Sequence, residues 1–254
     1  MEADIATADR TFDLSLFVTR LSSHSTLSEG DRETILNLPT VKMSLNANAE
    51  LAFAETETDF VFFVASGLCD TFRRTRDGKR QVSAIHIPGD MVNLYSVVVD
   101  AKAGGVHASC PTNLLCISRG ALSVVARKHP AISNAFWRDC LVDAAVMMQW
   151  INNLGRRDAI SKLAHVFCEM AVRRSQQCPP TMTYTLPIAQ YRLSDAISIT
   201  PVHLSRMLSD LRKQELLDFD DYVVTIHNWK LLARLAQFTP NYLLRRKADL
   251  EDCR

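Results

Sequence analysis

Residues 200–213 have the types and spacing that suit hydrogen bonding to the edges of DNA bases. Thr200 can cap the free N–H groups of a first helical turn, and Pro201 suits the first helical position. Apolar residues at 204, 207, 208 and 211 then form one face of a helix. The opposite face begins with His203 and carries Arg206. Such a helix fits the DNA major groove, and the alternative is an ordinary surface helix of a helical domain.

Several short elements must position this helix. The range 188–213 predicts two short helices separated by a tight break, and residues 183–186 favour a short strand before them. Residues 216–226 predict a small hairpin, a wing that can lie along the DNA phosphate backbone. Helical spacing also marks 159–173 and 231–238, whereas the charged tail from Thr239 is expected to be loose.

The N-terminal half has a different pattern. Short alternating apolar runs are bounded by Gly, Asp, Asn and Pro, and Asp77-Gly78 between two of them is a strong hairpin signal. Seven such runs predict a sandwich or a jelly-roll barrel. The expected strands are Val41–Leu45, Glu50–Ala54, Phe60–Ala65, Leu68–Thr75, Arg80–Ile87, Val106–Cys110 and Leu114–Ser118.

A long helix is predicted between these two halves, from Ala131 to about Leu154. Apolar residues surround much of its circumference, so we expect it to be buried on more than one side. One side could pack on the barrel and the other on a second copy of the chain; the alternative is complete burial within one subunit. The candidate dimer contacts are Phe136, Val142, Val146 and Trp150. Residues 155–158 interrupt the helix and predict a hinge.

The length and the charge distribution of the chain suggest an acidic N-terminal part and a basic C-terminal part with different functions. The chain has 254 residues, 47% of them hydrophobic and 22% charged, as in soluble globular proteins. The formal net charge is +1, but residues 156–254 carry 15 Lys+Arg against 11 Asp+Glu, whereas the first 155 carry 14 against 17. A basic C-terminal part suits DNA.

The seven cysteines form no Cys-x-x-Cys pair, which argues against a disulfide scaffold and a zinc finger. Reduced thiols in the cytoplasm are the simpler interpretation. The N-terminus lacks the pattern of a signal peptide, and no run of about 18 apolar residues predicts a membrane span.

This order of parts resembles the Crp/Fnr family of bacterial transcription regulators, over roughly residues 14–238. The stretches that carry the resemblance are 62–68 (FFVASGL), 77–81 (DGKRQ), 87–90 (IPGD), 154–159 (LGRRDA) and 199–206 (ITPVHLSR). The resemblance implies an α+β fold with a cyclic-nucleotide-binding-like jelly-roll sensor domain (12–130), a dimerisation helix and hinge (131–155) and a winged helix-turn-helix (156–240). It also implies a homodimer on palindromic DNA and RNA polymerase as a partner.

The resemblance further implies that Arg206 reads a guanine, to which a guanidinium can donate two hydrogen bonds. Ser205 matches the Fnr-type pattern and is a candidate for contact with a base or a phosphate. Val202 stands where many relatives have a glutamate, so His203 could supply the polar contact instead. Ser198 stands where relatives usually have glycine, which implies strain if the backbone φ is positive. The candidate DNA-binding residues are Gln190, Thr200, Val202, His203, Ser205 and Arg206.

The cofactors of related regulators are not expected here. Cyclic-nucleotide members hold the phosphate with an arginine, and residues 103–109 contain none. Iron–sulphur members have an N-terminal cysteine cluster, but the first cysteine is Cys69. Haem ligation by His86 or His107 competes with the commoner role of a hydrogen-bonded strand histidine. Cys178 could sense oxidants if exposed, with a bystander thiol as the alternative.

Two other functions compete with DNA binding. A jelly-roll metalloenzyme of the cupin type needs clustered ligands, typically His-x-His, and the seven histidines include no such pair. We therefore expect no catalytic or metal site and no enzymatic activity. A sensor or scaffold that uses the winged helix for protein contacts would need an apolar or acidic recognition face, against which Ser205 and Arg206 argue.

Overall fold

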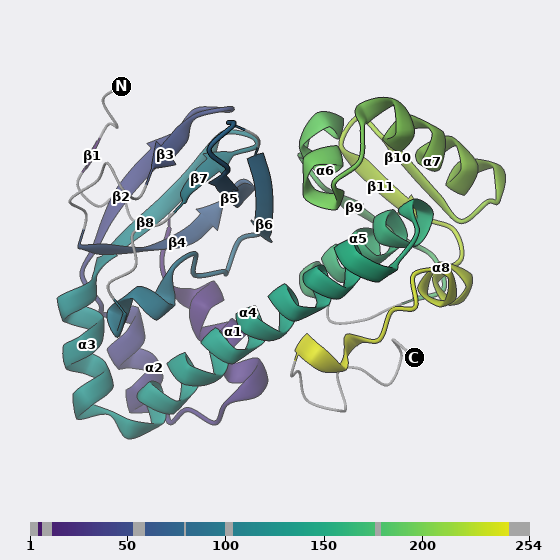
Figure 1. Cartoon of the computed structure of the whole chain (residues 1–254). Helices are drawn as coiled ribbons and strands as arrows, with labels where there is room; N and C mark the ends of the chain where they lie inside the picture. The colour runs from purple at the N-terminus through teal and green to yellow at the C-terminus, as the bar shows by residue number, and fades with distance from the viewer. Residues whose placement is uncertain are drawn as a thin grey trace. The chain divides into compact units, whose positions relative to one another are not determined.

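A computed structural model describes residues 5–6, 12–52, 59–78, 80–99, 104–175 and 179–243 (Figure 1). The chain forms two compact units, Met1–Asp143 and Ala144–Arg254. Their division falls inside the long helix α4 (Pro130–Arg156). The three-part division at 130 and 155 follows elements rather than compact units, and it stays a prediction.

The first unit is a roll of two four-stranded antiparallel sheets with helices at one end (Figure 1). The strand orders are β1-β2-β8-β4 and β3-β7-β5-β6, and each of the seven expected strands has a counterpart, although residues 53–54 of the expected strand Glu50–Ala54 lie outside the described residues. Its elements before α4 are β1 (Ile5–Ala6), α1 (Ser15–His24), α2 (Glu29–Leu36), β2 (Thr40–Leu45), β3 (Glu50–Ala52), β4 (Phe60–Ser66), β5 (Cys69–Arg74), β6 (Arg80–His86), the 3₁₀ helix η1 (Leu94–Val97), β7 (Gly105–Ala108), β8 (Thr112–Ser118) and α3 (Arg119–Lys128).

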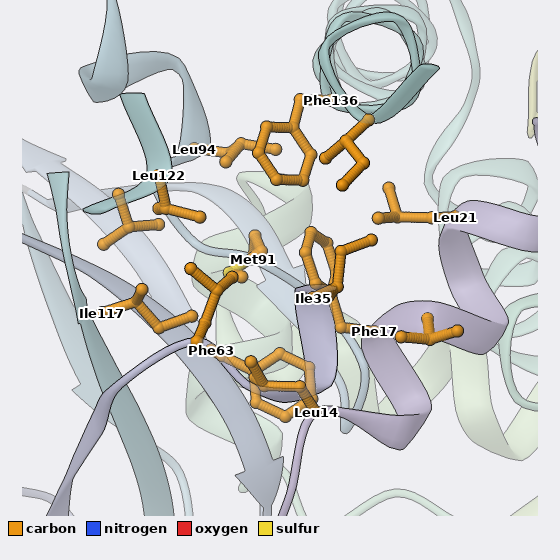
Figure 2. Close-up of a cluster of buried hydrophobic side chains, with 14 of the residues drawn as sticks. Leu14, Phe17, Leu21, Ile35, Phe63, Met91, Leu94, Ile117, Leu122 and Phe136 are labelled. Atoms are coloured by element: carbon orange, nitrogen blue, oxygen red, sulfur yellow. The ribbon is translucent and has the colours of Figure 1, made fainter. Parts of the chain in front are cut away.

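Strand β4 is buried on both faces because it lies between two hydrophobic clusters. Phe62 and Val64 point into the roll, where they join apolar side chains of β2, β5, β7 and β8. Val61 and Phe63 face the other way and join a cluster formed with the helices. Figure 2 shows Phe63 together with Phe17 of α1 and Phe136 of α4 in this second cluster. The jelly-roll expectation is therefore confirmed, with an interior filled by apolar side chains.

A buried ionic cluster joins α1, the turn after β6 and α4. Gly89 adopts a φ of 102° in that turn, and the Asp90 carboxylate accepts the backbone N–H of Ile87 at 2.8 Å. The Arg20 guanidinium pairs with Asp90, with Asp139 at 2.6 Å and with Asp143 at 2.8 Å. Burial alone would raise the pKa of Asp139, but the charge of Arg20 and the hydrogen bonds from His24 and Arg20 together outweigh burial and lower that pKa.

The second unit surrounds α5, which contacts α6, α7 and α8 (Figure 1). Its small antiparallel sheet has the order β10-β11-β9, so the expected hairpin carries a third strand. The elements after α4 are α5 (Ala159–Arg174), β9 (Met182–Thr185), α6 (Gln190–Ile197), α7 (Pro201–Lys213), β10 (Leu217–Asp220), β11 (Val223–Ile226), α8 (Trp229–Leu235) and the 3₁₀ helix η2 (Pro240–Leu243).

The junction of α4 and α5 is held by side chains that the hinge prediction did not consider. Helix α4 continues through Gly155 to Arg156, and Asp158 then caps α5. The buried carboxylate of Glu169 accepts hydrogen bonds from Trp150 Nε1 at 3.2 Å and from the Tyr242 hydroxyl at 2.9 Å. The prediction of a loose tail from Thr239 is therefore wrong for residues 240–243, because Tyr242 satisfies a buried acceptor.

Candidate nucleic-acid interface

The break between α6 and α7 fixes the start of the candidate recognition helix. Ser198 ends α6 with φ 55° and ψ 48°, the left-handed conformation that glycine adopts most easily. Thr200 Oγ1 accepts the backbone N–H of His203 at 3.2 Å, and Pro201 occupies the first turn. The predicted cap and the positive φ at Ser198 are both confirmed. Serine at this position carries the strain that the sequence suggested.

Helix α7 separates its apolar and polar sides as expected. Leu204 and Leu211 are fully buried against the unit, while Val202 is 66% exposed. Val202 and Arg206 lie four residues apart on the outward face, with Ser205 beside them. All six candidate DNA-binding residues are exposed: Gln190, Thr200, Val202, His203, Ser205 and Arg206. The fold thus brings them to the surface, and their contact with DNA stays a prediction.

The three cations of α7 have different surroundings. Arg212 Nε pairs with Asp218 Oδ1 at 2.6 Å, and its Nη2 pairs with Asp220. Lys213 lies 3.9 Å from Asp210. Within the described ranges no carboxylate pairs with Arg206. Arg206 is therefore available to an external acceptor, whereas Arg212 is held by the hairpin that follows α7.

That hairpin, β10–β11 (217–226), is the wing predicted from the sequence. Asp221 and Tyr222 form its turn with φ values of 44° and 62°, and both are exposed. Asp218 also accepts a contact from His227 Nε2 at 2.8 Å. The expectation that the wing follows the phosphate backbone finds no support in its charges, because Asp218, Asp220 and Asp221 are acidic and the hairpin contains no lysine or arginine.

The candidate dimer residues of α4 lie on its buried side. Phe136, Val142, Val146 and Trp150 are only 4–7% exposed within the single chain. Side chains already buried by their own chain have little surface left for a partner, and the contact of these four residues with a second copy stays a prediction. The exposed apolar side chains of the same helix are Trp137 (57%), Leu141 (57%), Met147 (45%), Met148 (62%) and Ile151 (70%).

The exposed stripe on α4 has the spacing of a coiled-coil seam. Trp137, Leu141, Ala144, Met148 and Ile151 follow one another at alternating intervals of four and three residues. Sequence reasoning detected apolar residues on several sides of α4 but could not tell which side the chain itself covers. The alternating four- and three-residue interval is the signal in the sequence that marks the exposed side.

The polar side chains of the roll are engaged with one another. His107 Nδ1 lies 3.0 Å from Asp70 Oδ2, and His86 Nε2 lies 3.3 Å from Thr71 Oγ1. Both histidines are therefore hydrogen-bonded strand residues, the alternative to haem ligation that the sequence left open. No group of three or more His, Cys, Asp or Glu side chains able to hold a metal occurs in the part of the chain that is described.

Four thiols of the described chain are not activated. Burial raises the pKa of Cys69 and Cys168, and it raises the pKa of Cys116 and of Cys140 to about 12. The candidate sensor Cys178 lies outside the described residues. No helix among the described residues is long and apolar enough to cross a membrane.

Two family models match the two units of the chain. A model described as a Crp-like helix-turn-helix domain matches residues 161–235, which include α6, α7 and the wing. A model described as a cyclic nucleotide-binding domain matches residues 42–129, which include the roll.

Similar proteins span most of the chain. The transcriptional activator protein FnrL of Cereibacter sphaeroides is 24% identical over 72% of this chain and 75% of its own length. The fumarate and nitrate reduction regulatory protein of Vibrio cholerae is 23% identical over 86% and 88%. The structure of FixK2 from Bradyrhizobium japonicum has the same fold, with a TM-score of 0.69 and 22% identity over 80% of this chain and 100% of that one. A mutant of CooA from Carboxydothermus hydrogenoformans matches with a TM-score of 0.65 and 18% identity over 89% and 96%.

Asp90 and the segment 104–109 bear on whether the roll could hold a cyclic nucleotide. The Asp90 carboxylate is bound by the Ile87 N–H and by Arg20. A side chain at Gly104 or Gly105 would collide with the backbone of the roll at 2.5 or 2.7 Å, so these glycines serve close packing. Residues 104–109 contain no lysine or arginine that could hold a phosphate.

Proposed function

The chain belongs to the Crp/Fnr family of transcription regulators, and on this premise we propose that it binds a palindromic DNA site as a homodimer. Homodimer binding is typical of the family. The observation that carries the proposal is the exposed face of α7, where Arg206 lacks a carboxylate partner in the described part of the chain. A guanidinium in this position can donate two hydrogen bonds to guanine O6 and N7, which discriminates by about 1–3 kcal/mol.

The neighbours of Arg206 would modify which sequence is read. Val202 offers only apolar contact, for instance to a thymine methyl, and His203 on the adjoining surface offers a hydrogen bond. Ser205 is placed for a base or phosphate contact, and Gln190 and Thr200 complete the proposed interface. Because Val202 replaces a frequent glutamate, we propose that the half-site differs from that of relatives with glutamate.

For the dimer, we propose the exposed stripe of α4 rather than the buried residues. Trp137, Leu141, Met148 and Ile151 would form a parallel two-stranded seam with the same residues of a second copy. Ala144 lies within the seam and permits close approach of the two helices. A parallel seam places two recognition helices in symmetric positions, as a palindromic operator requires.

The remaining parts of the proposal concern partners and cofactors. The family consists of transcription regulators, so we propose no enzymatic activity, action on DNA in the cytoplasm, and RNA polymerase as the further partner. We also propose that the roll acts without cAMP, an iron–sulphur cluster or haem. Two observations support this. Asp90, His86 and His107 already form hydrogen bonds within the roll, and no cysteine precedes Cys69 in the sequence.

The test is selection of bound sites from random duplex DNA by the purified full-length chain, with and without hydrogen peroxide. We expect enrichment of a two-fold symmetric sequence containing a guanine in each half-site. Enrichment only without peroxide would indicate a redox signal. Absence of any enriched sequence, with affinity independent of salt, would favour the scaffold or metalloenzyme alternatives.

A further inference from the structure

We propose that the wing of this protein repels the DNA backbone, so that stable binding depends on base contacts made by α7. This inference rests on the proposed function, and it adds Asp218, Asp220 and Asp221 as determinants of specificity. The wing is thereby assigned a role opposite to the phosphate contact expected of a hairpin beside a helix-turn-helix.

The first support is the local charge. Residues 201–226, which span α7 and the wing, contain three Lys+Arg and five Asp+Glu, a net charge of −2. The surrounding C-terminal part, residues 156–254, has a net charge of +4. The basic excess of the DNA-binding unit is therefore absent from the elements that carry the candidate base-reading residues. Non-specific DNA affinity comes almost entirely from neutralised phosphates, so this arrangement lowers it.

The second support is the confinement of Arg212. Its guanidinium contacts two carboxylates of strand β10, Asp218 at 2.6 Å and Asp220. The hydrogen bond to Asp218 and the nearby Asp220 charge raise the pKa of Arg212. Contacts from His227 and Arg212 lower the pKa of Asp218 in return. A guanidinium already shared by two carboxylates has little left to offer a phosphate.

The third support is the turn at the end of the wing. Asp221 is exposed, and no ion pair compensates its charge in the described ranges. Its positive φ of 44° is one that aspartate and asparagine adopt more readily than other residues with side chains. Asp221→Asn therefore removes one charge while the turn keeps its conformation.

The experiment measures affinity of the homodimer for a duplex of unrelated sequence and for the selected operator, each over a series of salt concentrations. We expect Asp221→Asn to bind the unrelated duplex on the order of threefold more tightly at low salt. Operator affinity should rise less, so the ratio of specific to non-specific affinity should fall. The matched control is Glu33→Gln, which makes the same charge change at an exposed position of α2 and should leave this ratio unchanged.

A second pair of variants tests Arg212. Asp218→Asn with Asp220→Asn releases the guanidinium, and we expect the slope of log affinity against log salt to steepen by about one phosphate contact. Adding Arg212→Ala to this variant should remove that increase. Circular dichroism and thermal unfolding confirm that each variant is folded before binding is measured.

Two results would overturn the inference. In the first, Asp221→Asn and Glu33→Gln change the affinity for both duplexes equally, which would mean that the turn lies away from DNA. The released Arg212 could leave the salt slope unchanged, which would mean that it does not reach a phosphate. Failure of the proposed function is distinguishable, because the unmodified protein would then bind neither duplex in a salt-dependent way.

Discussion

Arg206 combines exposure, a place on the outward face of α7 and the lack of a carboxylate partner in the described chain. Arg212 lies on the same helix, but two aspartates of the wing hold it. Residue type alone would treat the two arginines as equivalent. Their surroundings make Arg206 the candidate for base recognition and Arg212 a structural cation.

We expect Arg206→Ala to lower affinity for the selected operator by about 1–3 kcal/mol and to relax the choice at one base pair in each half-site. The reason is the loss of two hydrogen bonds to guanine. Binding to operators substituted at each position measures both effects. Arg212→Ala is the control, which should keep the sequence preference. An unchanged preference in Arg206→Ala would refute its role.

His165 in α5 is a buried imidazole between aromatic rings. Its ring lies 5.4 Å from that of Phe238 and 6.2 Å from that of Tyr242, and Nδ1 has no hydrogen-bond partner among the described residues. Burial, with a smaller effect of the Arg157 charge, lowers the pKa of His165 to about 3. The folded protein therefore keeps this ring neutral at pH values where the unfolded chain protonates it.

Stability should consequently fall as pH decreases from about 6.5 towards 3, by up to ~1.4 kcal/mol per pH unit from this group. The sign follows because the unfolded state binds the additional proton in that range. Urea unfolding between pH 4 and 7 measures the slope. His165→Gln should reduce the slope by about one proton, and His203→Gln, at an exposed position, is the matched control. Equal slopes for wild type and His165→Gln would contradict the burial of a neutral ring.

At the scale of elements, α4 carries one buried and one exposed apolar face. Val142 and Val146 belong to the face that the chain itself covers, and Leu141, Met148 and Ile151 belong to the exposed face. An exposed apolar stripe on a helix of 27 residues is a candidate interface. The alternating intervals of four and three residues favour a second copy of the same helix.

Leu141→Glu combined with Ile151→Glu should convert the dimer to a monomer, because it places like charges in the apolar seam. Sedimentation equilibrium measures the assembly state, and operator affinity should fall with it. Val142→Ala is the matched control on the buried face. It should lower the free energy of unfolding, on the order of 1–3 kcal/mol, and leave the dimer intact. Dimers that survive the double substitution would exclude this face.

At the scale of the whole molecule, the proposed dimer seam would relate the two half-sites of the operator by symmetry. Each copy carries one α7, so a two-fold axis along the seam presents two recognition helices. Such pairs bind half-sites about one helical turn apart, on the same side of the duplex.

Inserting about 5 base pairs between the half-sites should therefore reduce binding towards the non-specific level, because it rotates one half-site to the opposite side of the duplex. Removal of one half-site should have a similar effect. Footprinting and gel-shift titration with these duplexes measure both losses. A footprint confined to a single half-site would contradict the symmetric dimer.

Local sequence patterns predicted most of the elements correctly. Alternating runs identified the seven strands of the roll, and Thr200-Pro201 identified the start of α7, because these signals depend on neighbours in the chain. The outward residues of α7 followed from helical spacing once its start was known. The positive φ at Ser198 followed from comparison with the glycine of the family pattern.

Only the tertiary structure decided which charges already have partners and which apolar faces are already covered by the chain. The pairing of Arg212 with the wing and of Tyr242 with Glu169 joins residues brought together by packing. Which face of α4 is covered likewise depends on what packs against it, because the spacing of its apolar residues allows either face to be buried. The sequence therefore determined the recognition helix and its arginine. The structure decided that Arg206 is available, that Arg212 is held by the wing, and which stripe of α4 remains for a partner.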